Sequence, residues 1–299
     1  MARAVSDLGP GLPVRTRSRR RRGNPVGTWV KYGFLTLFAV MTLYPMLLVV
    51  STAVRDPLDI TADPFDLFTS FRIENLREAW VDGLFGEYLW NTVLTTVPTT
   101  IATVVLSVLA GYAFARLDFP GRTALFYLLM FGLMIPFTGI MIPLYYQLRD
   151  MQLLDTWWAV ILPLTAGVTG VGMPFGVFLM RSFFQGMPRE LAEAAKVDGT
   201  SEFGVFRHVM LPLVRPGAAV LAVFTFIQAW NTFFLPLIYL QGEDRRLLAT
   251  GLYQFAGGRT AEVELLAAGA LITIVPVVVF FLLFQRQFIR GLSAGALKG

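Results

Sequence analysis

The residue types that most often carry out catalysis are scarce in this sequence. The 299-residue chain has no cysteine and a single histidine, His208, so it offers neither a thiol nucleophile nor a pair of histidines for a zinc site. None of its three lysines is followed by serine or threonine, which excludes the P-loop that binds ATP. The HExxH motif of zinc proteases is also missing. These residues predict a protein that is not itself an enzyme.

Among the polar side chains in the most apolar stretches, three amides and an indole are candidates for a functional role. Asn91 lies near the start of one apolar run, and Gln228, Trp230 and Asn231 lie close together in another. A buried amide in lipid needs a hydrogen-bonding partner, so we expect Gln228 and Asn231 to face the interior of a helix bundle. Two roles are open: hydrogen bonding between helices, or lining a path for a polar solute such as a sugar. We take these four residues as candidates for a substrate pathway.

The composition indicates that these residues belong to a membrane protein. Hydrophobic residues make up 55% of the chain and charged residues 15%, whereas a soluble domain carries about 25% charged residues. Runs of roughly 20 apolar residues are long enough to cross a bilayer as helices. The predicted fold class is therefore all-α integral membrane. Its six transmembrane helices are expected at residues 32–52, 88–115, 123–148, 157–180, 217–240 and 265–284.

Proline and glycine interrupt the third and fourth of these runs. Backbone carbonyls that lose their helical partners must be satisfied by protein or by water in a cavity. Either the segments are broken helices that line a pathway, or their small residues pack closely against a neighbouring helix. The interrupting residues include Pro136, Gly139 and Pro143 in the third run and Pro163, Gly167, Gly170, Gly172 and Pro174 in the fourth.

The charged residues lie between the apolar runs and are distributed unevenly. With the N-terminus in the cytoplasm, 18 of 25 basic residues but only 6 of 20 acidic residues fall on the cytoplasmic side. This bias predicts an N-in, C-in topology. The first apolar run is too long for a signal-peptide core, which favours a retained span. We expect a basic, disordered cytoplasmic tail at 1–28, a six-span domain at 29–284 and a cytoplasmic C-terminal tail at 285–299.

The cytoplasmic loop between the fourth and fifth spans, residues 181–216, has the pattern of a helix–turn–helix. Pro188 suits the first turn of a short helix, and Gly199 suits the left-handed position that ends one. Ser201 can cap a second helix, after which we expect Pro212 to turn the chain back toward the membrane. The first helix has little side-chain bulk because it contains Ala192, Ala194 and Ala195.

This loop also resembles a known motif. Starting at Glu193 it reads Glu-Ala-Ala, three residues, Gly, nine residues, Val, one residue, Leu-Pro. The spacing is similar to the EAA loop of ABC-importer permeases, which usually has isoleucine where Val209 stands. The surrounding MPRELAEAAKVDG, the AWN of the fifth run and the C-terminal QRQFIRGLSAGALKG resemble the carbohydrate-uptake branch, in particular the second permease of maltose-type transporters. The resemblance covers roughly residues 29–299.

The resemblance implies how such a chain works. In this family the EAA loop forms a coupling helix that docks into a groove on a separate ATPase subunit. ATP and Mg then bind to that partner, and this chain binds no cofactor or metal itself. The residues expected to make the ATPase-coupling contact are Glu193, Ala194, Ala195, Asp198 and Gly199.

The resemblance also implies partners. They are a second permease subunit, two ATP-binding subunits, an extracytoplasmic solute-binding protein and membrane lipid, with no nucleic acid. The external segment at 53–87 carries eight acidic and three basic residues, which suits it to receive the binding protein. The implied location is the bacterial plasma (inner) membrane.

We therefore expect a multi-pass permease subunit of an ATP-driven importer that translocates a sugar or oligosaccharide by alternating access. Two alternatives stay open at this point. One is a secondary carrier or channel that works without ATP, although no ionisable residue lies within any of the six apolar runs to act as a proton relay. The other is an ABC permease for a non-sugar solute.

Overall fold

A computed structural model describes residues 25–256 and 262–296, with side chains over 29–256 and 262–285. The chain forms two compact units, residues 1–46 and 47–299. Within the described ranges every regular element is a helix or a helical turn. This finding agrees with the predicted all-α class.

The first helix, α1 (Pro25–Thr52), starts inside the stretch expected to be a tail at 1–28. Proline is well suited to this position because its fixed φ fits the first helical turn, where its missing N–H would have had no partner. Large apolar side chains on α1 are exposed, among them Trp29, Phe34 and Met41. Residues 1–24 of the expected tail lie outside the described residues.

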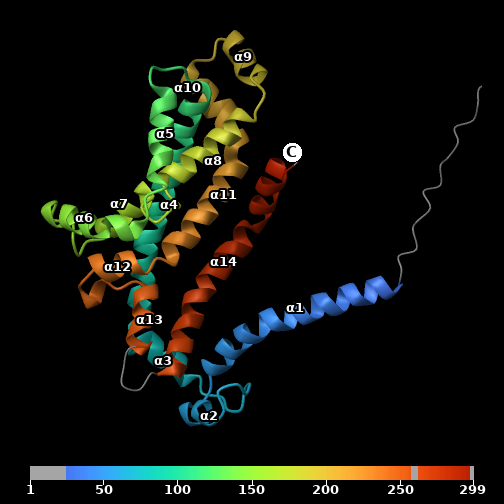
Figure 1. The fold of residues 1–299 in the computed structure, drawn as a ribbon, viewed down its shortest axis with the longest axis vertical. Helices are drawn as coiled ribbons and strands as arrows, with labels where there is room; N and C mark the ends of the chain where they lie inside the picture. Colours follow the sequence, from blue (N-terminus) through green and yellow to red (C-terminus); the bar gives the residue numbers. More distant parts are fainter. Residues whose placement is uncertain (1–24, 257–261, 297–299) are drawn as a thin grey trace, which may run out of the picture. The chain divides into compact units, whose positions relative to one another are not determined.

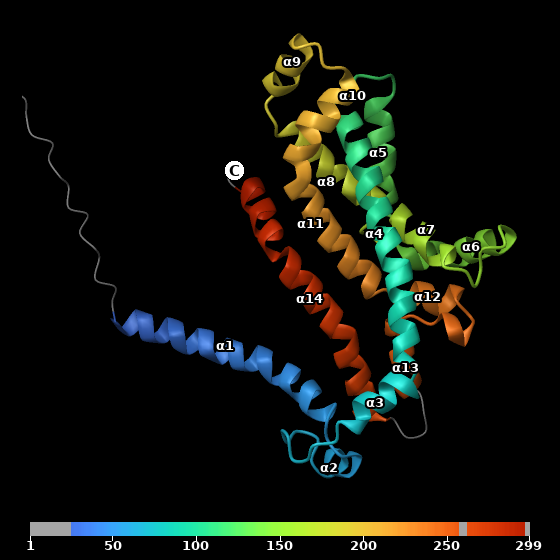
Figure 2. The ribbon, with the colours of Figure 1, turned by 180° about the vertical axis from the view of Figure 1, so that it is seen from behind.

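The second unit contains the other helices. In order they are α2 (Pro57–Ala62), α3 (Glu74–Val81), α4 (Phe85–Arg116), α5 (Arg122–Gly132), α6 (Phe137–Asp150), α7 (Trp158–Ala166), α8 (Met173–Gln185), α9 (Glu190–Val197), α10 (Glu202–Val205), a π-helical turn (Phe206–Met210), α11 (Leu211–Trp230), α12 (Phe234–Tyr239), a 3₁₀ turn (Glu243–Arg245), α13 (Leu248–Ala256) and α14 (Val263–Ala296). Within this unit, α9 and α10 lie at one end of α4 and α11 (Figure 1), and α3 and α13 lie at the other (Figure 2).

Four helices of the described residues are long and apolar enough to cross a membrane. They are Trp29–Thr52, Phe85–Arg116, Glu202–Trp230 and Val263–Gln285. A fifth span results if the bent pair α5–α6 is counted as one. These helices support an integral membrane protein, and the total of six spans stays a prediction.

The third expected span is divided at a sharp bend. Its two halves, α5 and α6, differ in direction by 98°. Pro136 stands at the bend in extended conformation, as the N-cap of α6. Proline has no N–H to donate to the preceding turn and disfavours helical conformation in the residue before it, so the helix stops here.

The fourth expected span is also divided, by the glycine-rich residues 167–172 between α7 and α8. Gly167 ends α7 with φ at 88°, and Gly170 follows with φ at 105°. Side chains with a Cβ rarely adopt these left-handed angles, so glycine permits the break. The expectation of an interrupted segment is confirmed.

The fifth expected span differs from the prediction at both ends. Pro212 does not turn the chain, because the helical path runs without a break from Glu202 to Trp230. The N–H of Leu211 donates to the carbonyl of Phe206, which is the wider π-type spacing. This wide turn accommodates a proline, which has no N–H for the regular ladder. Beyond Trp230 the helix stops, and α12 resumes only at Phe234.

The backbone near the C-terminus is helical as far as residue 296. Helix α14 continues to Ala296, through most of the stretch expected as a tail at 285–299. A helix that is already formed extends readily because each added residue gains a hydrogen bond without a new nucleation step. The letters GLSAG at 291–295 match the GxSxG pattern of esterases. They lie in this continuous helix, however, and not on the strand-to-helix turn that such a nucleophile requires.

Helix α4 packs closely against α8 because small residues line the contact. A Cβ built on Gly176 would overlap Ser107 of α4, and one built on Gly111 would overlap Met180 of α8. Close approach through small residues is the usual way that membrane helices associate. The face of α4 turned inward also carries a stripe of buried hydroxyls, comprising Thr92, Thr95, Thr96, Thr99, Thr100, Thr103 and Ser107.

This packing predicts opposite effects of two glycine-to-alanine substitutions. Gly176→Ala should destabilise the chain by about 1–3 kcal/mol because the added methyl group overpacks the contact. Gly132→Ala, where nothing lies within 4 Å, should be neutral or stabilise by up to about 1 kcal/mol because alanine favours helix. Thermal unfolding of the purified variants in detergent measures both. Equal shifts for the two variants would contradict the proposed helix contact.

Candidate functional site

The loop between α8 and α10 folds as the predicted helix–turn–helix. Helix α9 has Glu190 and Glu193 in its first turn and Lys196 in its last, which matches the direction of its dipole. Gly199 follows with φ at 81°. The Ser201 hydroxyl then accepts a hydrogen bond from the backbone N–H of Gly204 at 3.2 Å, which caps α10. The local prediction for this loop is confirmed up to the start of α10, except that Pro188 lies before the N-cap Arg189 and not in the first turn of α9.

The two faces of α9 have different surroundings. Ala192 and Ala195 are half-buried and pack against a core cluster that includes Tyr112, Phe184 and Phe206. Of the residues expected to contact an ATPase, Ala195 therefore lies on the inner face.

The outer face of α9 is exposed and combines one alanine with two carboxylates. It comprises Glu193, Ala194 and Asp198, with Gly199 exposed directly after the helix. Sequence reasoning missed Val197, which is 88% exposed. Its spacing of three residues from Ala194 was the available signal, since residues three apart share a face of a helix.

A polar contact holds the two helices of the loop together. An ion pair joins Lys196 of α9 to Glu202 of α10. The hydrogen bond from Glu202 raises the pKa of Lys196, because it favours the charged form of the amine. A cavity of about 470 Å³ lies beside this pair, and its walls include Arg116 and Arg189.

Asn91, a candidate for the substrate pathway, holds a loop in place. Its side chain is buried, and Nδ2 donates to the carbonyls of Asp244 at 2.8 Å and Arg246 at 3.1 Å. The amide thus pairs the start of α4 with the segment between α12 and α13. This geometry corresponds to the first of the two roles considered, hydrogen bonding within the protein.

Gln228 clamps the break between α7 and α8. Its Oε1 accepts from the N–H of Val171 at 3.0 Å, and its Nε2 lies 2.6 Å from both the carbonyl and the hydroxyl of Thr169. These groups belong to the segment that has left the helical ladder, so the amide supplies the partners that an interrupted helix lacks.

The last two candidate residues lie next to each other but face different surroundings. Trp230 is buried, and its indole N–H donates to the carbonyl of Thr273 in α14 at 3.1 Å. Asn231 ends α11, is exposed, and donates to the carbonyl of Ile227 in its own helix at 2.7 Å. The expectation that Asn231 faces the interior of this chain's bundle is wrong, because α11 stops at that point. The structure does not bring the four candidate residues together.

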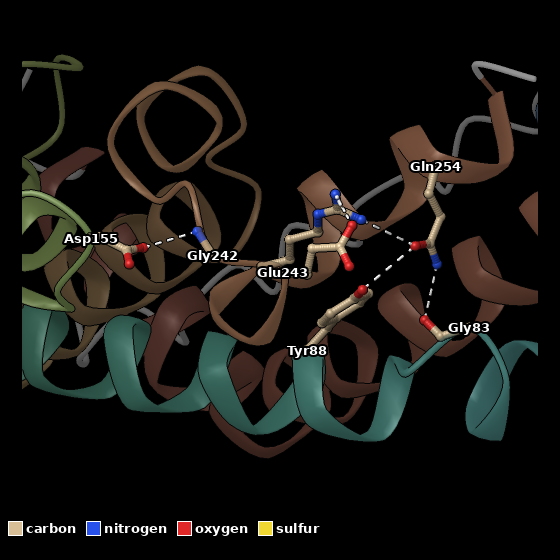
Figure 3. A network of polar contacts seen from close by, with 7 residues as sticks. Gly83, Tyr88, Asp155, Gly242, Glu243 and Gln254 are labelled. Carbon is tan, nitrogen blue, oxygen red and sulfur yellow. Dashed lines mark hydrogen bonds and ion pairs between the residues drawn. The ribbon is translucent and has the colours of Figure 1, made fainter.

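The end of the unit opposite α9 has its own polar network (Figure 3). Gln254 of α13 donates to the carbonyl of Gly83 at 2.9 Å and accepts from Tyr88 at 3.5 Å. The carboxylate of Asp155 accepts from the N–H of Gly242 at 3.0 Å. The contacts of Gln254 join α13 to the start of α4 and the residues before it, and the contact of Asp155 joins the connection between α6 and α7 to the segment after α12.

Arg55 organises the segment after α1 at this same end. Its side chain is fully buried and donates to the carbonyls of Asp59, Asp63 and Asp66 and to the hydroxyl of Thr69, over 2.6–3.0 Å. A buried guanidinium needs such partners because losing its hydration is costly. Sequence reasoning missed this role, since nothing distinguishes Arg55 from an ordinary loop arginine.

Comparison with protein families identifies the chain. Residues 103–293 match the model of the binding-protein-dependent transport system inner membrane component. The chain belongs to this family. The matched range includes α8, α9 and the whole loop at 181–216, so the EAA-like motif lies within the matched part of the chain.

Individual relatives of this inner membrane component are sugar-uptake permeases by name. The chain is 33% identical to the diacetylchitobiose uptake system permease protein NgcG of Streptomyces coelicolor, over 90% of this chain and 88% of the relative. It is 34% identical to the arabinooligosaccharides transport system permease protein AraQ of Halalkalibacterium halodurans, over 94% and 100%.

A solved structure shares the fold of this inner membrane component. A chain of a bacterial ABC transporter for import of the acidic polysaccharide alginate superposes with a TM-score of 0.78 at 22% identity, covering 89% of this chain and 98% of that one. A second structure of a bacterial alginate ABC transporter, in complex with a pentasaccharide-bound periplasmic protein, gives a TM-score of 0.64 at 15% identity.

The clamp made by Gln228 predicts a difference between two amides of the same helix. Gln228→Leu should destabilise the chain by about 1–3 kcal/mol because polar groups of the break lose their partners. Asn231→Ala should change stability by less than about 0.5 kcal/mol because the side chain is exposed. Thermal unfolding gives the stability, and hydrogen exchange of the peptide covering 167–172 should speed up only in Gln228→Leu. Unchanged exchange there would contradict the clamp.

Proposed function

We propose that this chain is a permease subunit of an ATP-driven importer and that it translocates a sugar or oligosaccharide by alternating access. The observation that carries the proposal is the outer face of α9, a short surface helix with small exposed residues within the EAA-like motif. Membership of the binding-protein-dependent family and the names of the sugar-uptake relatives support the same function.

The proposed topology has six spans, with both termini in the cytoplasm. Helices α5 and α6 together form the third span, and α7 and α8 form the fourth as a broken helix. The coupling loop at 181–216 then lies in the cytoplasm, and the segments at 53–87 and 241–262 lie outside. The six-span domain covers 29–284, between cytoplasmic ends at 1–28 and 285–299. The location of α9 and α3 at opposite ends of the same unit supports this arrangement.

In the proposed mechanism the outer face of α9 docks on an ATPase subunit. Glu193, Ala194, Asp198 and Gly199 form the contact, and Ala195 seats the helix on the core beneath. The small side chains admit α9 into a groove, and the carboxylates pair with basic residues of the partner. ATP drives the cycle only if it binds the two conformations of the assembly with different affinity. A second permease and a second ATPase subunit complete the proposed assembly.

A polar solute path lies at the breaks in the spans. Asn231 is the exposed member of the four candidate residues, so we assign it direct contact with the solute. Asn91, Gln228 and Trp230 act indirectly by holding the surrounding backbone. Amide groups match the hydroxyls of a sugar as donors and acceptors.

An extracytoplasmic binding protein delivers the solute to the outer end. The network of Arg55 fixes the backbone of the acidic segment at 53–87, where Asp63 and Asp66 remain exposed. A fixed acidic surface suits a partner with basic residues. The solved complex of an alginate transporter with a pentasaccharide-bound periplasmic protein supports a partner of this kind.

The proposed topology predicts the accessibility of two engineered cysteines. The natural chain has no cysteine, so Val197→Cys and Leu58→Cys each create a single thiol at a residue that is 88% and 80% exposed. A membrane-impermeant maleimide should label Leu58→Cys in intact cells, and Val197→Cys only after permeabilisation. The wild-type chain serves as the unlabelled control. Labelling of Val197→Cys in intact cells would place α9 outside and contradict the proposed mechanism.

The docking role predicts the effect of reversing one charge. In proteoliposomes that contain the purified assembly, Glu193→Lys should lower ATP-dependent oligosaccharide uptake by about tenfold or more, because like charges facing each other at an interface cost several kcal/mol. Membrane insertion should be unchanged, since Glu193 is exposed and outside the spans.

The matched control is Asp118→Lys, the same charge reversal at the same end of the unit but outside α9. Asp118 is an exposed carboxylate, 95% accessible and paired with Arg122. Its substitution should change uptake by less than about twofold. Wild-type uptake in Glu193→Lys, or an equal loss in the control, would remove the outer face of α9 from the mechanism.

A further inference from the structure

Arg116, in the last turn of α4, hydrogen-bonds to the connection that leads into α9. Its Nη2 donates to the carbonyls of Phe184 and Met187, both at 2.6 Å. Phe184 lies in the last turn of α8, and Met187 lies just before α9 begins. Short hydrogen bonds from a charged donor are among the stronger polar contacts in proteins.

This contact places a cation at the C-terminal end of α8. The last carbonyls of a helix lack partners within the helix, and a positive charge there is favourable. Gly186 lies between Phe184 and Met187 and ends α8. The chain then turns toward Pro188 and α9. We call the connection between α8 and α9, residues 186–189, the elbow. The guanidinium therefore binds carbonyls on both sides of Gly186 in this elbow.

Aromatic side chains pack against the same connection. The ring of Tyr112, one helical turn before Arg116 on α4, lies 5.4 Å from the ring of Phe184 and 4.9 Å from the ring of Phe206. Tyr112 and Phe184 thus fix the elbow on its apolar side, while Arg116 fixes it on its polar side. The elbow has little freedom to move without α4.

A separate contact joins α9 to the other long helix. The ion pair of Lys196 with Glu202 connects α9 to α10, which continues through the π-helical turn into α11. Besides its direct packing through Ala192 and Ala195, α9 is therefore connected to the membrane domain by two polar routes, one to α4 through the elbow and one to α11. Only the route to α4 passes through Arg116.

Helix α4 reaches the opposite end of the unit. With 32 residues it is about 48 Å long at 1.5 Å per residue. Near its far end Asn91 holds the backbone of Asp244 and Arg246. A shift of the cytoplasmic end of α4 is therefore coupled to the loop at its outer end.

We infer that Arg116 is a positioning residue that transmits movement of the coupling helix to α4. The inference rests on the proposed function, because it assumes that α9 is moved by an ATPase subunit. Arg116 lies outside the EAA-like motif and touches neither solute nor ATP. Its role is measured by the amount of solute transported per ATP hydrolysed.

The test compares three variants in the assembled transporter reconstituted in proteoliposomes. Arg116→Met keeps the side-chain length but removes the donors. The ratio of transport to ATP hydrolysis should fall about tenfold, the scale of losing a hydrogen bond to a charged group. Arg116→Lys keeps a charged donor on a shorter side chain, so the ratio should fall only about threefold.

The matched control is Arg122→Met, which removes a neighbouring arginine from the same cavity. Arg122 pairs with the exposed Asp118 and donates to the carbonyl of Leu117, and it does not touch the elbow. Its loss should change the ratio by less than about twofold.

The inference is supported if the ratio of transport to ATP hydrolysis is highest in the wild type, lower in Arg116→Lys and lowest in Arg116→Met. A wild-type ratio in Arg116→Met, or parallel losses of transport and ATP hydrolysis that leave the ratio unchanged, would overturn it. If Arg116→Met does not assemble, a wild-type ratio in Arg116→Lys overturns it and a reduced ratio supports it. If the wild-type assembly shows no ATP-dependent uptake, the proposed function fails independently of Arg116.

Discussion

Backbone polar groups in an apolar environment must find partners within the protein, and this constraint shapes every irregular part of the chain. A continuous helix satisfies it by itself, as α4 and α14 do. Where α7 gives way to α8, the amide of Gln228 supplies the missing partners. At the ends of the unit, Arg55 and Arg116 do the same for carbonyls in the last turn of a helix or just beyond it.

The same constraint explains why the polar residues in the spans have structural roles. Asn91, Gln228 and Trp230 each bond to backbone atoms of another segment. Broken helices give a transporter a polar interior and places to bend, but only if the freed backbone is held. In the proposed function, the solute path and its scaffold therefore use the same kind of side chain, and exposure separates the two roles.

The proposed mechanism depends on a connection between two ends of one unit. At one end α9 presents small residues on its outer face and packs through Ala192 and Ala195 on the core. At the other, the segments around α3 and α13 are joined by a network centred on Gln254 (Figure 3). Helices α4 and α11 link the two. The proposed coupling to a separate ATPase requires a connection of this kind, because work done at one face must change access at the other.

The sequence alone determined the features that depend on near neighbours. Apolar runs marked most of the helices, and spacing marked α9, the left-handed Gly199 and the Ser201 cap, because these follow from local backbone preference. Tertiary structure decided the partners: Gln228 with Val171, 57 residues away, Arg116 with Phe184, 68 residues away, and Asn91 with Asp244, 153 residues away. It also decided which alanines of α9 face inward and that a π-helical turn accommodates Pro212 within a continuous helix. Such choices depend on which surfaces meet in three dimensions, and no local pattern in the chain encodes them.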